Sequence, residues 1–230
     1  MRNLPDEIKY VDGYLDTATV HALSGTAADT WADTELNPKQ VTAIYGCMPI
    51  PRQGDNYADR DGRKIRLKKL VIKGYIYWNA LDSDTPPTQS GHVRICIVRD
   101  KRTNGVSLSG ENVIGAGLGS DGQATTSGNA GGINFCTNPD GWGRYVVLYD
   151  KTFRPPTTGA YGDQSADAGN VVGTSTPFKI KLTTNFNVNF CDTTGSVAAI
   201  VDNSIHMLAA QLQADQVANI CYYARQSFIG

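Results

Sequence analysis

Residues 60–78 (RDGRKIRLKKLVIKGYIYW) gather the side chains best suited to bind a charged partner. The segment holds seven Lys or Arg and one acid, Asp61, although the net charge of the whole chain is −1. Like charges side by side on a strand repel one another, so this ribbon needs a compensating polyanion or protein surface. The candidate nucleic-acid or subunit-contact residues are Arg60, Arg63, Lys64, Arg66, Lys68, Lys69, Lys73, Tyr75 and Tyr77.

The apolar residues of this ribbon predict one strand that contains a bulge. Ile65 and Leu67 hold one parity, whereas Leu70 and Ile72 hold the other. A one-residue bulge at Lys68-Lys69 would restore a single inward face. The outward face would then carry Lys64, Arg66, one of the lysine pair, Lys73, Tyr75 and Tyr77.

Three partners for this outward face stay open. Acids from elsewhere in the chain could neutralise it, a neighbouring copy could offer an acidic patch, or nucleic acid could supply phosphates. Tyr75 and Tyr77 could stack on bases or serve an interface, whereas Trp78 should point into the core by parity.

Residues for enzymatic chemistry are scattered along the chain. His21, His92 and His206 lie in unrelated segments without a metal pattern, and no GxSxG elbow occurs. Asp82 and Asp84 could bind Ca²⁺ or act as a glycosidase pair, but acids in a Pro-rich turn are typical of solvated loops. We therefore expect neither an enzyme nor a cofactor.

The tryptophans support an alternative function. Trp31, Trp78 and Trp142 could form a sugar-stacking platform, as in a carbohydrate-binding (lectin-like) or glycosidase-type β-sandwich.

The cysteines indicate a reducing compartment. Cys47, Cys96, Cys136, Cys191 and Cys221 are odd in number, widely spaced and without a CxxC pair, which argues against disulfides and zinc. Cys96 and Cys221 lie in apolar strand-like runs and should be buried thiols.

Composition favours a loop-rich β protein. The 230 residues are 40% apolar, contain 24 Gly and 10 Pro, and show no linker-like break, so a single domain over 1–230 is expected. No apolar run approaches the roughly 20 residues that span a bilayer, and MRNLPDEIKY does not resemble a secretory signal.

Strand-forming residues recur between Gly, Pro and Asn clusters. The segment 196–215 could instead be helical, but Asn203-Ser204 and the alternation after it favour a strand. Residues 102–142 predict a long loop with at most one helical turn near Glu111–Ile114, and 154–176 predict another. The predicted strands cover 7–21, 40–47, 64–78, 91–99, 143–150, 177–184, 187–191, 205–213 and 217–228.

Long, unequal connections between these strands argue against an up-and-down barrel. We expect an all-β fold, a single eight-stranded antiparallel jelly-roll sandwich with long inter-strand loops.

A series of short motifs adds a resemblance to a known family. An acidic-Lys-aromatic opening from Glu7 is followed by a Pro-x-x-Gly turn and then by strand motifs in a fixed order. This series resembles the capsid proteins of circovirus-like single-stranded DNA viruses that encode a replication initiator, over roughly residues 7–191. The later motifs stand at Pro51–Gly54, Arg60–Ile65, Lys69–Gly74, Val93–Lys101 and Arg144–Lys151.

The resemblance implies a viral capsid protein of the virion that assembles from about sixty copies (T=1) into a small icosahedral shell around circular single-stranded DNA. It implies a homo-oligomer without membrane insertion and with an unidentified host receptor. Asp100-Lys101 and Asp150-Lys151 would place charges where subunits meet, or would cap strand-to-loop turns locally.

The chain departs from the family at its start. Members normally begin with an Arg-rich arm that binds DNA and directs nuclear import, whereas only Arg2 precedes Glu7 here. The arm has been removed, lies outside the numbered chain, or is dispensable, and we expect removal. Without it, DNA binding should be weak, and localisation to the host nucleus during assembly depends on its presence.

Overall fold

The structure, a computed structural model, is all-β. It describes residues 7–20, 32–33, 49–78, 92–106, 108, 113–114, 141–154, 175–211 and 218–230, with the backbone alone at 15–20, 32–33, 78 and 211. The strands are β1 (Lys9–Val20), β2 (Ala32–Asp33), β3 (Lys64–Trp78), β4 (Val93–Asp100), β5 (Tyr145–Phe153), β6 (Thr176–Asn189), β7 (Ser204–Gln211) and β8 (Ala218–Ile229).

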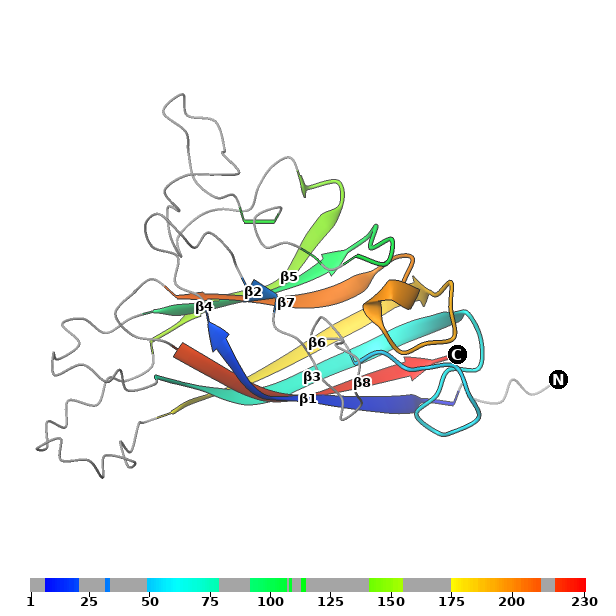
Figure 1. Cartoon of the computed structure of the whole chain (residues 1–230), viewed down its shortest axis with the longest axis horizontal. Helices are drawn as coiled ribbons and strands as arrows, with labels where there is room; N and C mark the ends of the chain where they lie inside the picture. Colours follow the sequence, from blue (N-terminus) through cyan, green and yellow to red (C-terminus); the bar gives the residue numbers. More distant parts are fainter. Residues whose placement is uncertain are drawn as a thin grey trace, which may run out of the picture.

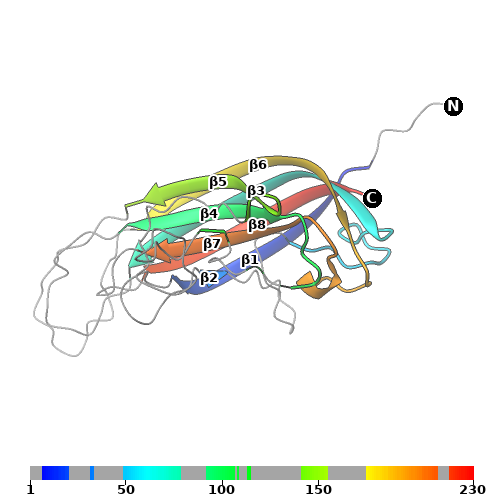
Figure 2. The same cartoon turned by 90° about the horizontal axis from the view of Figure 1, so that it is seen from above.

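These strands form two antiparallel sheets that face each other (Figures 1 and 2). Sheet A has the strand order β1-β8-β3-β6, and sheet B has the order β2-β7-β4-β5. Most strands that pair are far apart in sequence, since among the described strands only β4 and β5 are both consecutive and hydrogen-bonded. The expectation of an all-β chain with two antiparallel sheets is confirmed.

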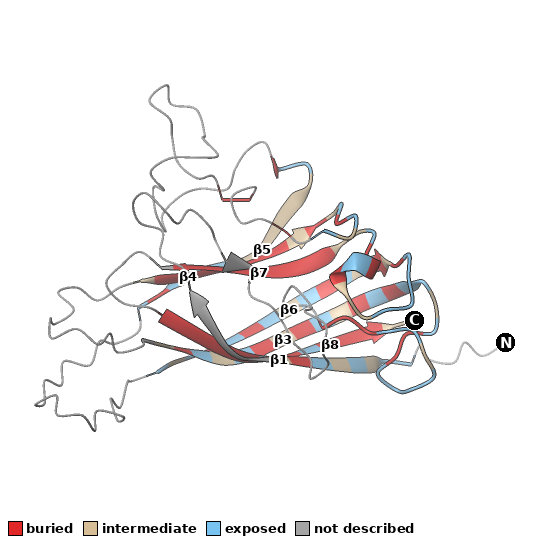
Figure 3. Ribbon diagram, in the orientation of Figure 1, coloured by how far each residue is buried: buried red, intermediate tan, exposed pale blue. Residues whose placement is uncertain are grey.

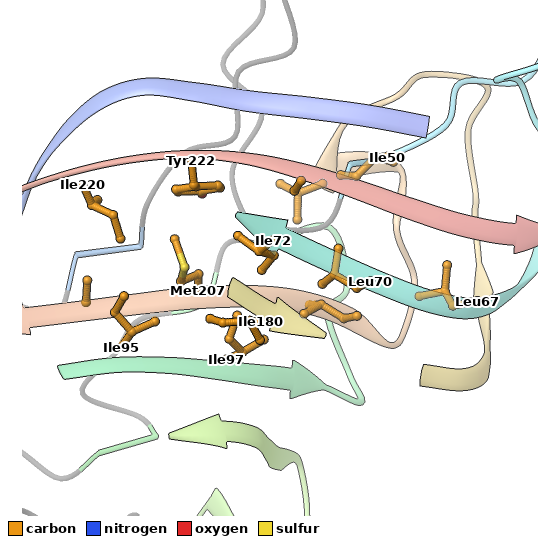
Figure 4. Packing of buried hydrophobic residues seen from close by; sticks show 14 of the residues in the cluster. Ile50, Leu67, Leu70, Ile72, Ile95, Ile97, Ile180, Met207, Ile220 and Tyr222 are labelled. Atoms are coloured by element: carbon orange, nitrogen blue, oxygen red, sulfur yellow. The ribbon is translucent and has the colours of Figure 1, made fainter. Parts of the chain in front are cut away.

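The core lies between the inner faces of the two sheets. Buried residues alternate with exposed ones along β3 and β6, as expected for strands with one solvated face (Figure 3). Leu70 and Ile72 of sheet A pack in the same cluster as Ile95, Ile97 and Met207 of sheet B (Figure 4). The apolar phase read from the sequence therefore selects the inner face of β3.

Part of the outer face of sheet B is covered by the connection between β4 and β5. Cys96 and Val98 of β4 form a second buried cluster with Leu108, Val113 and Ile114, which belong to the connection between β4 and β5. This packing explains why β4 is buried on both faces, whereas β6 alternates.

The predicted bulge in β3 is confirmed. Pairing with both neighbouring strands shifts between Leu67 and Lys69. Leu67 and Leu70 are both buried, so the extra residue restores one inward face. The amide Nε2 of Gln226 and the hydroxyl of Ser227 donate to the Lys69 carbonyl at 2.9 and 3.2 Å, which holds the bulge in place.

Gly74 marks the closest approach of strands in sheet A. An added Cβ would lie 2.7 Å from the Tyr222 Cβ and would also run into the Cys221 carbonyl. Glycine is therefore required here by the neighbouring strand rather than by a turn.

Several strand predictions need correction. The predicted strands 177–184 and 187–191 are parts of one strand, β6, which continues through Asn185 although its φ is 40° and which ends at Asn189. The short β2 was not expected, and the predicted strand at 40–47 lies outside the described residues. The helical alternative for 196–215 is wrong, since β7 occupies this region after a 3-10 turn at Val197–Ala199. Within the described ranges, no helix is long and apolar enough to cross a membrane.

Candidate nucleic-acid or subunit interface

Cations gather on the outer face of sheet A, which we call the basic face. The side chains of Lys64, Arg66, Lys69 and Lys73 on β3 are exposed there because the inward positions between them are apolar. Strands β6 and β8 extend the same surface. The basic face comprises Lys64, Arg66, Lys69, Lys73, Lys179, Lys181 and Arg225.

Strand register brings these cations close together. Lys73 lies directly opposite Lys179 of β6. One step along the same face, Val71 lies opposite Lys181 on one side and Arg225 on the other. Like charges opposite each other destabilise a sheet, so the pairing of Lys73 with Lys179 costs free energy in the isolated protein.

Acids offset little of this charge. Asp12 of β1 accepts two hydrogen bonds from Arg225, at 2.6 and 2.7 Å. These bonds lower the pKa of Asp12 and raise that of Arg225. Within the described part of the chain, no other cation of the basic face forms an ion pair, although Arg66 Nε donates to Asn185 Oδ1 at 3.1 Å.

Tyrosines lie on the same face. Tyr75 is 46% exposed and Tyr223 is 42% exposed, while Tyr77 is half-buried. The rings of Tyr75 and Tyr77 are 5.8 Å apart between centroids. Tyr223 lies across from Lys73 in the register of β3 and β8, so aromatic and cationic side chains are interleaved. The side chain of Trp78 is not among those described, so its inward direction stays a prediction.

The prediction for Arg60 is wrong, because this side chain is fully buried. Its guanidinium stacks on the Phe190 ring at 4.2 Å and donates to the carbonyls of Pro51, Gly62 and Asp192. Burial lowers its pKa. Arg60 therefore organises the segment before β3 and cannot touch a partner.

Of the other candidates, Arg63 is exposed at the entry to β3, and Lys68 is half-buried at the bulge.

The aspartates of the two Asp-Lys pairs contact arginines of the same chain, although Asp150-Lys151 lies within β5 rather than just past a strand. Asp100 is fully buried and accepts two hydrogen bonds from Arg144, at 2.8 and 2.7 Å, and one from the backbone of Arg102. Asp150 accepts hydrogen bonds from Arg94. The local-capping alternative holds for Asp100, and contact between Asp100 and a neighbouring subunit is wrong as a prediction.

Candidate catalytic residues are not brought together where the structure describes them. His206 is buried, with its Nε2 2.6 Å from the Ser204 hydroxyl, and His92 is half-buried in another segment. Among the described residues, no group of three His, Cys, Asp or Glu could hold a metal ion. His21, Asp82, Asp84, Cys47 and Cys136 lie outside the described part.

Two further predictions concern single side chains. Cys96 and Cys221 are buried as expected, and burial raises the pKa of the Cys96 thiol to about 12.

Of the three tryptophans proposed to form a sugar platform, Trp142 is 68% exposed. The side chains of Trp31 and Trp78 lie outside the described residues, so the platform stays a prediction.

Sequence reasoning missed three members of the basic face, Lys179 and Lys181 of β6 and Arg225 of β8. The signal was present in PFKIKLTT, where the lysines occupy every second position between buried residues. What the sequence could not provide was the pairing of β6 with β3, which places these lysines beside Lys73.

Comparison with known proteins adds no identification. No protein-family description matches the chain, and no curated protein matches it.

Proposed function

We propose that this chain is a viral capsid protein whose two sheets form a single eight-stranded jelly roll. In this proposal, copies assemble into a small closed icosahedral shell around circular single-stranded DNA. The chain acts as a non-catalytic structural subunit of the virion, and it reaches the host nucleus only when a basic arm is present.

The observation that carries the proposal is the strand order of the two sheets. Along the chain, β1, β3, β6 and β8 belong to sheet A, while β2, β4, β5 and β7 belong to sheet B. Nearly every connection therefore crosses from one sheet to the other. Such crossing connections are expected of a jelly roll and are incompatible with a meander or an up-and-down barrel.

Open strand edges are a second feature that supports assembly. β1 and β6 are the edge strands of sheet A, and β2 and β5 are those of sheet B. β6 is a 14-residue edge strand whose free side has no described strand beside it. Exposed edges favour association, and in a shell each subunit can cover the edges of its neighbours.

Particle formation tests the proposal. We expect the protein to elute at megadalton mass and to form uniform closed particles in negative-stain electron microscopy. Light scattering at several salt concentrations and pH values, with and without an added Arg-rich arm, gives the mass. A chain that stays monomeric under all of these conditions would contradict the proposal, and glycan binding by that monomer would favour the carbohydrate-binding alternative.

A further inference from the structure

The basic face carries a compact group of lysines contributed by two strands. Side chains on one face of a strand repeat about every 6.8 Å, and neighbouring strands lie about 4.8 Å apart. In the register of β3 with β6, Lys73 lies opposite Lys179, and Lys69 lies opposite Thr183, the next outward position after Lys181. Four ammonium groups therefore share a surface about 14 Å long and two strands wide.

Repulsion within this group has no described acid to relieve it. Asp12, on the opposite edge strand β1, is already hydrogen-bonded to Arg225 of β8. Lysines are flexible point charges, which suit a row of phosphates better than a single fixed carboxylate. A polyanion would relieve the repulsion and release counterions as it binds.

The tyrosines favour a single strand over a duplex as the nucleic acid bound by this face. Tyr75 continues the β3 row beyond Lys73, and its ring lies beside that of Tyr77. Exposed aromatic rings beside a basic strip offer stacking surfaces for unpaired bases, and every base has a face that can stack. A duplex hides its base faces in the helical stack and cannot use these rings in this way.

We infer that the basic face is itself a binding site for single-stranded nucleic acid, independent of any N-terminal arm. The strand lies lengthwise over β3 and β6, with phosphates on Lys69, Lys73, Lys179 and Lys181 and with bases on Tyr75. Binding is tolerant of sequence, because lysines and tyrosine rings read no base edge. The binding needs no shell, whereas its role in holding a packaged genome rests on the proposed function.

The test substitutes Lys179 and Lys181 of β6. Both lie outside residues 60–78, the segment whose charge first suggested the site. Binding of fluorescent oligothymidylate of about 20 nucleotides is measured by anisotropy with the full chain over a series of salt concentrations. For Lys179→Gln/Lys181→Gln, the log–log salt slope should fall by about 0.7 for each lost phosphate contact, about 1.4 in total. Tyr75→Leu should weaken binding about tenfold and leave the slope unchanged.

The matched control is Lys101→Gln/Arg102→Gln, which removes the same charge from the turn after β4, at the end of sheet B. Thermal unfolding confirms that each variant is folded. The inference is overturned if the control lowers the slope as much as the β6 variant does. It is also overturned if the β6 variant keeps the wild-type slope but no longer forms particles, because the face would then be a subunit interface. A wild-type protein that binds the oligonucleotide but never assembles supports the inference and contradicts the proposed function.

Discussion

At the scale of single residues, Arg60 is a buried cation whose described hydrogen bonds all go to neutral oxygens. Pro51, Gly62 and Asp192 offer backbone carbonyls, and Gln53 offers its amide oxygen at 3.5 Å. The guanidinium thereby ties the turn before β3 to the segment after β6. A charge held in this way is costly to bury but also costly to remove, since its acceptors would lose their donors.

Replacing Arg60 with Met should destabilise the protein by about 2–4 kcal/mol, because buried carbonyls are left unpaired. Urea unfolding of the soluble chain gives the free energy of unfolding. Arg63→Met is the matched control, since Arg63 is exposed, and it should change stability by about 0.5 kcal/mol or less. Equal effects of the two substitutions would mean that the contacts of Arg60 contribute nothing.

Asp59 is a buried carboxylate in the same turn. Burial acts to raise its pKa, but hydrogen bonds from Asn56 and Arg52 outweigh burial and hold the pKa below its ordinary value of 3.8. Because the folded pKa is depressed, the stabilisation is complete above the ordinary pKa and is lost as pH falls through the folded pKa.

Asp59→Asn should therefore lower the free energy of unfolding at neutral pH but flatten its decline in acid. The difference from wild type should shrink between about pH 5 and pH 2. Urea unfolding at a series of pH values measures this difference. Asp55→Asn, an exposed change in the same turn, should follow the wild-type curve. A constant gap between Asp59→Asn and wild type would rule out the ionic contribution.

At the scale of elements, the bulge keeps both halves of β3 in phase with the core. Deleting Lys68 would turn one half of the strand over, because a one-residue slip moves every side chain to the opposite face. The deletion should cost more than about 4 kcal/mol or prevent folding. Lys68→Ala keeps the residue count and should cost about 1 kcal/mol or less. Soluble yield and urea unfolding separate the two variants, and a stable deletion variant would show that the bulge can be dispensed with.

Local patterns account for what the sequence predicted well. The bounds of β3 and its bulge follow from apolar parity within fifteen residues, and β4, β5, β7 and β8 follow from similar runs. The continuity of β6 was missed because Asn185, between the predicted strands 177–184 and 187–191, is typical of a turn. In the fold, Thr184 and Asn185 stand opposite the bulged Lys68, so the irregularity of β3 is matched by one in β6.

Non-local pairing accounts for what was missed. The burial of Arg60 depends on Phe190 and Asp192, and the extent of the basic face depends on β6 lying beside β3. Neither the contacts of Arg60 nor the pairing of β3 with β6 can be predicted from a short window of sequence. Charge alone pointed to β3, but it could not separate the buried cation Arg60 from the exposed ones.

At the scale of the whole molecule, Asp12 sets one border of the basic face. Asp12→Asn would release Arg225 toward solvent, so oligothymidylate should bind more tightly and the salt slope should steepen by about 0.7, the value of one added phosphate contact. Anisotropy titrations measure both quantities. Asp55→Asn makes the same change in net charge away from the face, and an equal gain from it would indicate a general charge effect.

The position of β8 has a consequence for how the chain reaches its native state. β1 and β3 do not pair with each other, because the last strand in the sequence lies between them. Sheet A therefore stays divided during synthesis until residues 218–230 emerge, and closing it brings together segments about 200 residues apart, which is slow. A chain that stops before Ala218 would present a vacant slot one strand wide. A separate peptide with the β8 sequence could fill this slot, in the manner of donor-strand complementation.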